Sequence, residues 1–397
     1  MNIVVVPYHD WRKIEMEGAR TRDSHIISHL AANKDIENLI ILNRPISYLE
    51  LMVKKKMRKI SGKLLFRYKQ CSLYELAPKF YVIDYISNSF LGPIRDGKKW
   101  FFDSYGDDEF ISGYEKCVDY LKININIILT QNVFSAKFCS KVKTPAVFDG
   151  WDNFLLFPEN SKLQANFISA YTSLAKTCEA WVTNASKNIE FYNKHYNPKS
   201  CHLVKNGVDV ETFSKSYKLP TDLKNISRPI VGFGGKITHL FDYELFNYIV
   251  KDNSDKSFVI VGQILDSNVF SKIIKAKNVY YLGDKHYKQY PSYVTNFDIG
   301  IIPYVTNSLE HGADSIKVYE YIASGLKVVG TAGAGMSDMQ EYIYIGKTKE
   351  EFSAIINRAI SDKNTIILPE FYTWKYKSQT IVKLLKQVAM DRVSVKN

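Results

Sequence analysis

The sequence predicts an α/β protein with two domains, each built on a parallel sheet covered by helices. Short apolar runs of strand length alternate with longer stretches that carry the three-and-four spacing of an amphipathic helix. At 397 residues, the chain is too long for one ordinary hydrophobic core. A polar stretch near the middle interrupts the alternation, which then starts again. Together these observations predict two Rossmann-like domains.

The first half of the chain, residues 1–210, supplies seven candidate strands rich in β-branched and other apolar residues. Residues 21–32, 109–121 and 163–176 lie between them and have helical spacing. Because parallel strands need crossover connections, this order predicts a mainly parallel sheet. The candidate strands are Ile3–Val6, Leu39–Leu42, Tyr81–Tyr85, Ile127–Leu129, Ala146–Phe148, Ala180–Thr183 and His202–Val204.

The second half begins after a predicted linker. Residues 211–228 are polar, contain Pro220 and show no clear period. The alternation then resumes over residues 225–371, the predicted second domain, and residues 372–397 predict a terminal helix. The candidate strands of this domain are Ile230–Phe233, Phe258–Val261, Val279–Leu282, Ile299–Ile302 and Leu326–Val329.

Composition and charge narrow the classes of function. The 46% hydrophobic content is typical of a globular protein, and no apolar run reaches the roughly 18 residues of a membrane span. The five cysteines and eight histidines show no metal-ligand spacing, so we expect no metal site and reduced thiols in a cytoplasmic protein. The start, Met1–Pro7, lacks a basic leader and predicts a strand rather than a signal peptide. The net charge of +12 predicts an anionic partner.

Residues 314–330 carry the most informative pattern in the chain. They predict a helix from Ser315 to Ser324, with Ser315 as the N-cap, a stop at Gly325 and then a strand. A helix amino end attracts phosphate, and Lys317 adds a positive charge beside it. Glu320 could accept hydrogen bonds from a ribose diol. The alternative is a surface ion pair between Lys317 and Glu320 on an ordinary crossover helix.

This stretch and three others, in the same order along the chain, resemble the signature of GT-B glycosyltransferases, especially retaining enzymes of family 4. After Glu320 the sequence is Ala323-Ser324-Gly325-Leu326-Lys327-Val328-Val329, where the family commonly has Ala-x-Gly-x-Pro-Val-Val. Lys327 therefore stands where proline is usual. The other matching stretches are Asn206-Gly207-Val208-Asp209, Val231-Gly232-Phe233-Gly234-Gly235-Lys236 and Phe297-Asp298-Ile299-Gly300-Ile301-Ile302-Pro303-Tyr304.

The resemblance implies two Rossmann-like domains that face one another across a cleft. Residues 1–210 would bind the acceptor, residues 225–371 the nucleotide diphosphate sugar, and the terminal helix would return to the first domain. The implied reaction is transfer of the sugar to a glycan or lipid-linked glycan, with retention, in bacterial envelope polysaccharide synthesis. A UDP-sugar is the favoured donor, with guanosine and thymidine diphosphates still open, and no metal or other cofactor is expected.

The resemblance also assigns donor-side roles. Gly234 and Gly235 would let backbone N–H groups approach the diphosphate, and Lys236 would neutralise a phosphate oxygen. The usual second basic residue is missing near Leu240, and Lys317 is a candidate replacement. Family members often have two glutamates separated by seven residues, but Gly312 occupies the first position here. Either Glu310 contacts the donor sugar from a longer loop, or backbone groups of residues 311–313 do so.

In the first domain, acidic residues follow a strand directly. Asp149 is a candidate general base for the acceptor hydroxyl, and Asp152 a candidate for binding sugar hydroxyls. The alternative is helix capping by Asp152 or Asn153.

An earlier loop holds Gly18, Arg20 and Arg22. In related enzymes a glycine-containing loop at this place approaches the donor phosphates. Arg20 and Arg22 would contact phosphate, or lie on a solvated helix start.

Residues 51–69 mix clustered lysine and arginine with leucine, methionine, isoleucine and phenylalanine. A basic amphipathic segment is typical of a membrane-surface element, which would hold the enzyme on the inner face of the cell membrane. The alternative is a solvated charged face. We find no nucleic-acid-binding motif and expect no nucleic-acid partner. Two other functions stay open: a glycosyltransferase-like binding protein without turnover, and a sugar-nucleotide epimerase of the same architecture.

Overall fold

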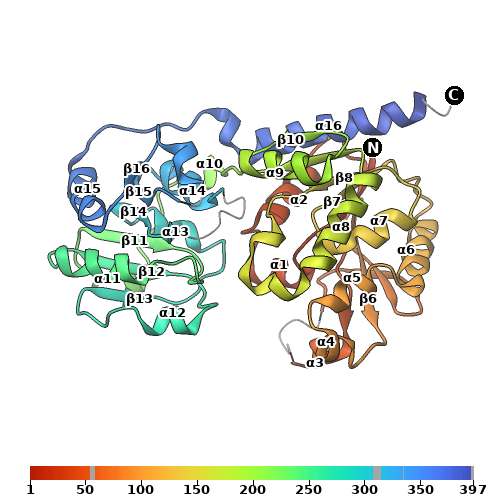
Figure 1. Cartoon of the computed structure of the whole chain (residues 1–397), viewed down its shortest axis with the longest axis horizontal. Coiled ribbons are helices and arrows are strands. Elements are labelled where there is room, and N and C mark those ends of the chain that lie inside the picture. Colours follow the sequence, from red (N-terminus) through yellow and green to blue (C-terminus); the bar gives the residue numbers. More distant parts are fainter. Residues whose placement is uncertain (54–58, 307–313, 334, 395–397) are drawn as a thin grey trace. The chain divides into compact units, whose positions relative to one another are not determined.

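The computed structural model describes residues 1–53, 59–306, 314–333 and 335–394, which form two compact units (Figure 1). The first unit takes in Met1–Lys205 and Lys377–Asn397, and the second takes in Asn206–Tyr376. The predicted linker at residues 211–228 is wrong as a linker. Phe213 and Leu223 are fully buried in the core of the second unit, so this polar stretch is packed against it.

The first unit is built on a sheet with the strand order β10-β9-β8-β7-β1-β2-β6-β5-β4, and β3 also pairs with β6. All pairings are parallel except those of the hairpin β4–β5 and of β5 with β6. The strands are β1 (Asn2–Val6), β2 (Asn38–Leu42), β3 (Ile46–Ser47), β4 (Lys63–Tyr68), β5 (Cys71–Ala77), β6 (Phe80–Ser87), β7 (Ile127–Thr130), β8 (Ala146–Asp149), β9 (Ala180–Thr183) and β10 (Cys201–Leu203).

Helices connect the parallel strands of this unit, and its hydrophobic core lies where they meet the sheet. The α-helices are α1 (Trp11–Glu17), α2 (Arg22–Ala31), α3 (Tyr48–Val53), α4 (Gly92–Asp96), α5 (Lys99–Ser104), α6 (Asp108–Leu121), α7 (Ala136–Lys141), α8 (Gln164–Thr177) and α9 (Ser186–Tyr196). The 3-10 helices are η2 (Val133–Ser135), η3 (Phe154–Leu156) and η4 (Pro158–Leu163).

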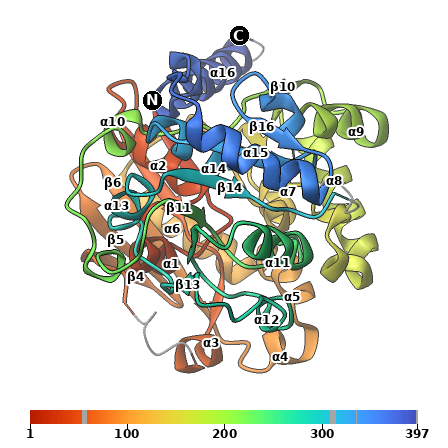
Figure 2. The same ribbon diagram turned by 90° about the vertical axis from the view of Figure 1, so that its left-hand side faces the viewer.

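The second unit has six parallel strands in the order β13-β12-β11-β14-β15-β16. This is the strand order 3-2-1-4-5-6 of a doubly wound nucleotide-binding sheet. Helices α11 and α15 pack together on one face, and α13 and α14 lie on the other (Figures 1 and 2). The strands are β11 (Ile230–Gly234), β12 (Ser257–Val261), β13 (Val279–Tyr281), β14 (Ile299–Ile302), β15 (Lys327–Thr331) and β16 (Tyr344–Gly346).

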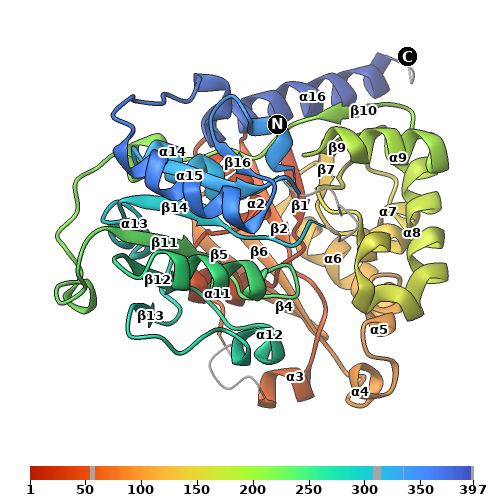
Figure 3. The same cartoon turned by 60° about the vertical axis from the view of Figure 1, so that its left-hand side comes forward.

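The helices of the second unit complete its two outer layers, which Figure 3 shows from a third direction. The α-helices are α10 (Val210–Phe213), α11 (Tyr243–Asp252), α12 (Ser267–Ser271), α13 (Tyr290–Val294), α14 (Ile316–Ala323) and α15 (Lys349–Ser361). The 3-10 helices are η5 (Thr221–Leu223), η6 (Met336–Met339) and η7 (Glu370–Tyr372). Helix α16 (Trp374–Ser394) follows, and from Lys377 onward it belongs to the first unit, where Lys386 pairs with Asp35 at 2.8 Å.

The α/β prediction is confirmed, and all twelve predicted strands exist with shifts of at most a few residues. The hairpin β4–β5 and strand β16 were not predicted. Residues 51–69 do not form one surface element, because they include the end of α3 and, from Lys63, a strand paired with β5. Of this basic stretch, residues 54–58 lie outside the described part of the chain.

Candidate functional site

The crevice of interest in the second unit lies where the strand order of its sheet reverses. Strands β11 and β14 are neighbours there, while their chain connections lead to opposite sides of the sheet. In sheets of this kind, ligands bind beyond the carboxyl ends of the strands at this switch point. The residues that follow the two strands are Gly235 and Lys236 after β11, and Pro303 and Tyr304 after β14.

The glycines after β11 make room for side chains from other elements. A Cβ atom at Gly234 would lie 2.2 Å from the hydroxyl of Tyr290, and one at Gly235 would lie 1.9 Å from Cε of Lys317. The N–H of Gly234 donates to the Tyr321 hydroxyl at 2.7 Å, and the N–H of Gly235 donates to the Val261 carbonyl at 2.8 Å. These two N–H groups are therefore bonded within the protein, and the prediction that the glycines let backbone N–H groups approach a diphosphate stays a prediction. Because the two glycines have no side chains, they leave the space that Tyr290 and Lys317 occupy.

That space is occupied by Lys317, from the first turn of α14. Its side chain crosses Gly235, and its ammonium donates to the Tyr304 hydroxyl at 2.9 Å. The same ammonium lies 5.9 Å from the ring centre of Phe233, a residue of β11. The structure thus holds a half-buried positive charge over the carboxyl ends of both switch-point strands. Lys236, directly after Gly235, is also half-buried.

Glu320 is a buried carboxylate one turn further along α14, with 4% of its surface exposed. Tyr287 donates a hydrogen bond of 2.7 Å to its Oε1. Burial raises the pKa of Glu320 to about 7, although Tyr287 and the charge of Lys317 act in the opposite direction. The surface ion pair offered as the alternative is therefore wrong for Glu320. A buried carboxyl group that titrates near neutral pH is typical of a functional site.

The start of α14 contains a polar atom with no partner. Ser315 is the N-cap by position, but its hydroxyl caps no backbone N–H. The Oγ atom is buried, and it makes no hydrogen bond with any described residue. Such an atom next to a helix amino end fits a ligand that accepts hydrogen bonds, such as a phosphate. Directly before it, Asp314 binds the Asn206 side chain and backbone and accepts from Tyr319 at 2.6 Å.

The structure assigns a different role to the predicted base of the first unit. Asp149 is fully buried, and Arg22 donates to both of its oxygens at 3.0–3.1 Å. Gln131 adds a third donor at 3.0 Å. A general base must reach the proton that it removes, and this carboxylate is covered and already saturated with donors. The predictions of a catalytic Asp149 and a ligand-binding Arg22 are therefore wrong, because the two residues form a buried structural ion pair.

The other predicted residues of the first unit have local roles. Gly18 ends α1 with a φ of 81°, and Arg20 pairs with Glu17 at 2.5 Å. Asn153 caps the 3-10 helix η3 by accepting from the Leu155 N–H at 3.2 Å, which confirms the capping alternative for Asn153. The carbonyl of Asp152 accepts from the Tyr192 hydroxyl at 3.2 Å. The contact between the Asp152 side chain and sugar hydroxyls stays a prediction.

Comparisons with known proteins agree with this architecture. No family model matches the sequence. TuaH of Bacillus subtilis (strain 168), which carries the name of a teichuronic acid biosynthesis glycosyltransferase, is 31% identical over 148 residues. The match covers 36% of this chain and 37% of TuaH, so little more than a third of that relative is represented.

Two solved structures match almost the whole chain. A trehalose-6-phosphate synthase, analysed for glycosyl transfer with retention, aligns with a TM-score of 0.62 and 12% identity, over 97% of this chain and 99% of that one. HepE of Anabaena in complex with UDP-glucose aligns with a TM-score of 0.60 and 12% identity, over 99% and 100% of the two chains. This chain has the GT-B fold.

The structure places one of the two departures from the GT-B glycosyltransferase signature. Lys327, in the usual proline position, is buried at the start of β15, and its ammonium donates to Asp362 at 2.8 Å. This pair helps keep the pKa of Asp362 well below its usual range. The lysine therefore fastens the strand to the end of α15. The other departure, Gly312 at the position of the first glutamate, and its candidate replacement Glu310 lie outside the described residues.

The sequence interpretation missed the tyrosines of the crevice in the second unit. Tyr287, Tyr290 and Tyr321 surround Glu320 and the glycine loop. Tyr304 directly follows the proline of the Asp-x-x-x-x-Pro stretch, so its place at the end of a strand beside the crevice could have been predicted from the sequence. Tyr287 precedes α13 and Tyr290 is the first residue of that helix. Neither residue belongs to a motif, so only the fold could bring them to the site.

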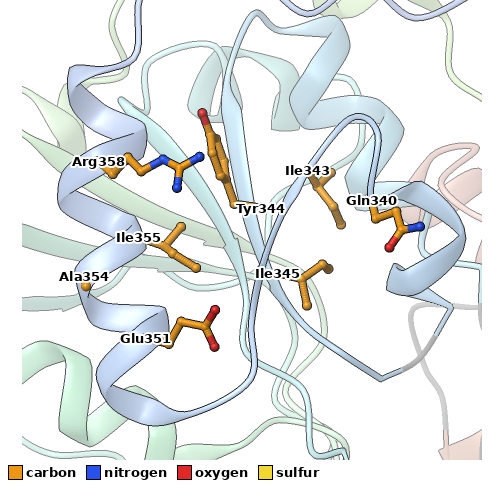
Figure 4. A pocket seen from close by; sticks show the side chains of 8 residues that line it. All are labelled: Gln340, Ile343, Tyr344, Ile345, Glu351, Ala354, Ile355 and Arg358. Atoms are coloured by element: carbon orange, nitrogen blue, oxygen red, sulfur yellow. The ribbon is translucent and has the colours of Figure 1, made fainter.

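A separate groove of about 440 Å³ lies between β16 and α15 (Figure 4). The guanidinium of Arg358 lies 5.2 Å from the ring centre of Tyr344 at one end of it. No residue of the glycine loop or of α14 lines this groove. Among the described ranges, no cluster of three metal-ligating side chains occurs, and no helix has the length and apolar character of a bilayer span.

Proposed function

We propose that this protein is a glycosyltransferase that uses a nucleotide diphosphate sugar, with a UDP-sugar favoured. The observation that carries the proposal is the cluster at the switch point of the second unit: Lys317 lies across Gly235, with buried Glu320 one turn away. A cation and a helix amino end suit the leaving diphosphate, and a buried carboxylate suits the ribose hydroxyls. HepE, a neighbour of the same fold, holds UDP-glucose.

In this reaction, the bond between the anomeric carbon and the diphosphate oxygen breaks, and a bond from the acceptor oxygen to that carbon forms. Lys236, Lys317 and the Ser315 hydroxyl would stabilise the charge that develops on the leaving diphosphate. Glu320 would fix the nucleoside, since it must be ionised to accept two ribose hydroxyls. We propose that these groups suffice without a metal ion, and that the configuration is retained, as for the trehalose-6-phosphate synthase neighbour.

We further propose a glycan or lipid-linked glycan acceptor in bacterial envelope polysaccharide synthesis. The name of TuaH, which refers to teichuronic acid biosynthesis, supports this direction. Exposed apolar side chains on α3 and α4, including Val53 at 75% and Ile94 at 63%, support contact with a membrane surface. These helices lie at the same end of the first unit in Figures 1, 2 and 3. The sequence between them carries the run of lysine and arginine at residues 54–59.

The proposal is tested by titrating the purified full-length chain with UDP-, GDP- and dTDP-sugars in a calorimeter, with and without EDTA. We expect saturable binding of one donor class, unchanged by EDTA, and at least tenfold weaker binding by Lys317→Gln. A transfer assay on a polysaccharide acceptor follows for the donor that binds. Absence of binding by any donor would contradict the proposal. Binding without transfer would identify a nucleotide-sugar-binding protein instead.

A further inference from the structure

A second crevice lies at the switch point of the first sheet, within the first unit alone. Strands β1 and β7 are neighbours there, and the strand order reverses between them. The segment after β1 (Tyr8 to Asp10), Arg44 after β2 and Asn132 after β7 line a cavity of about 370 Å³. Position at a switch point and this volume are both typical of a small-molecule site. None of the residues predicted to bind the donor in the second unit contributes.

One wall of the cavity is aromatic. Tyr8 stacks on Phe134 with ring centres 6.4 Å apart, and Phe101 lies 5.8 Å from Phe134. Aromatic faces carry partial negative charge and attract polarised C–H bonds, such as those on one face of a sugar ring. Other residues that line the cavity are polar or charged, so the cavity suits a ligand with one apolar face and several polar groups.

Asp10 places an unsatisfied acceptor in this cavity. The residue is 2% exposed, and its Oδ1 accepts from the Arg12 N–H at 2.8 Å. Its Oδ2 is buried without a hydrogen bond among the described residues. Arg12 and Arg44 lie 3.6 and 3.8 Å from this oxygen, which is beyond hydrogen-bond distance. A buried carboxylate oxygen in this state fits a ligand that donates a hydrogen bond, such as a hydroxyl group.

Two lysines of the cavity have no carboxylate closer than 4.0 Å among the residues that the structure describes. The ammonium of Lys13 is 4.0 Å from Glu17, and Glu17 already pairs with Arg20 at 2.5 Å. The ammonium of Lys98 donates to the neutral side chain of Asn160 at 2.8 Å. Arg44, in contrast, is bound by Glu50. Lys13 and Lys98 are therefore the two cations that an anionic ligand group would meet.

We propose that this crevice binds the terminal unit of the acceptor, and that this unit is a sugar bearing a carboxylate or phosphate group. The proposal rests on the proposed glycosyltransferase function. The apolar face of the sugar packs on the aromatic wall, one hydroxyl donates to Oδ2 of Asp10, and the anionic group meets Lys13 and Lys98. The two sources of negative charge share the same recognition, and separate probes distinguish them.

Ligand-observed NMR titrations of the full-length protein test this with methyl glucuronide, glucose 6-phosphate and methyl glucoside. We expect at least one anionic probe to bind about tenfold more tightly than the neutral glucoside, as for one charge-assisted hydrogen bond. The double variant Lys13→Gln/Lys98→Gln changes only exposed or half-buried side chains, and it should bind all three probes equally. Asp10→Asn should weaken all three.

The matched control is Lys199→Gln, which removes an exposed lysine of the same unit that pairs with Glu179. It should leave every probe affinity unchanged. Equal binding of the three probes by the unmodified protein, or no binding at all, would overturn the proposal. A donor titration of the same samples keeps the two proposals apart. Donor binding without probe binding contradicts only the acceptor site. Probe binding without donor binding contradicts the transferase function and, with it, the assignment of the bound sugar as an acceptor, but leaves the crevice as a site for an anionic sugar.

Discussion

Each unit buries one carboxylate that the sequence marked as functional, and the two are stabilised in different ways. Asp149 in the first unit has an arginine on both oxygens and a glutamine besides. Glu320 in the second unit has the Tyr287 hydroxyl on one oxygen and a lysine nearby, and burial raises its pKa to about 7. A carboxylate whose hydrogen bonds are complete is part of the structure. One whose desolvation is only partly compensated is available to a ligand.

Removal of the Asp149 charge should have the largest effect of the changes considered. Asp149→Asn removes the negative charge to which the buried Arg22 guanidinium donates, which should lower the free energy of unfolding by about 3–5 kcal/mol. Urea unfolding followed by circular dichroism measures this loss. A stable Asp149→Asn protein with lost turnover would instead restore the catalytic role.

The matched control replaces both charges at once. Arg22→Met/Asp149→Leu removes the ion pair but fills its volume with apolar groups, and such replacements are often close to neutral. We expect the double variant to recover most of the stability lost in Asp149→Asn. A loss as large as that of the single variant would show that the pair has a further structural role.

In the second unit, the position of the Lys317 ammonium depends on the space left by the missing side chain of Gly235. In Gly235→Ala, the new Cβ would overlap Cε of Lys317 and displace the ammonium from its place over β11. We expect the affinity for UDP to fall about tenfold or more, since a charge-assisted contact contributes about 1.5–3 kcal/mol. Calorimetric titration with UDP measures it.

Gly330→Ala, on a strand of the same sheet, is the control, because its nearest new contact is 3.3 Å from a flexible methionine. It should bind UDP as the unmodified protein does. Equal losses in both variants would mean that the sheet, and not Lys317, is responsible.

Replacing Glu320 by its amide should raise the free energy of unfolding above pH 7, whereas the same change at Asp149 should lower it. The folded protein keeps this proton up to a pKa of about 7, whereas the reference value is 4.5. The contribution of this group to stability is therefore full below about pH 4.5 and is lost as the pH rises to about 7. Glu320→Gln should lack this decline, and above pH 7 it should be more stable by about 3 kcal/mol at most.

The same variant should bind UDP more weakly, because an amide presents only one acceptor to the ribose hydroxyls. Urea unfolding between pH 4.5 and 8.5, together with UDP titration at pH 8, gives both quantities. Higher stability with lower affinity is the expected combination for a residue kept for function. Glu320→Gln that is less stable at pH 8 would assign Glu320 to the same structural class as Asp149.

The fold was predictable because strand and helix periodicity are local properties of the chain. The predicted strand Ile299–Ile302 matches β14 residue for residue. The hairpin β4–β5 was missed because its first strand is half-exposed at the sheet edge and carries the charges of Lys63 and Arg67, which obscure the alternation. Strand β16, only three residues long, is too short for any period.

The candidate site was predictable only in part. Lys317 and Glu320 lie on one helix whose amino end could be recognised, so their joint position followed from spacing. The pairing of Arg22 with Asp149 joins residues 127 positions apart, and no local pattern reports it. For the same reason, sequence reasoning could not separate the saturated carboxylate from the available one.

The smallest expected effect concerns the exposed apolar side chains of the first unit, for which we propose a contact with a membrane surface. Ile94 on α4 is 63% exposed, and insertion of its side chain into a membrane surface would stabilise binding by roughly 1 kcal/mol. Ile94→Ser should therefore weaken binding to vesicles rich in anionic lipid about fivefold in a sedimentation assay.

Ile168→Ser, at an exposed position on α8 of the same unit, should bind as the unmodified protein does. If both variants lose binding equally, exposed apolar area alone is responsible and α4 is not a membrane contact. If the unmodified protein binds neutral and anionic vesicles equally, the basic residues near α3 do not contribute to binding, and the exposed apolar side chains of α3 and α4 would account for it.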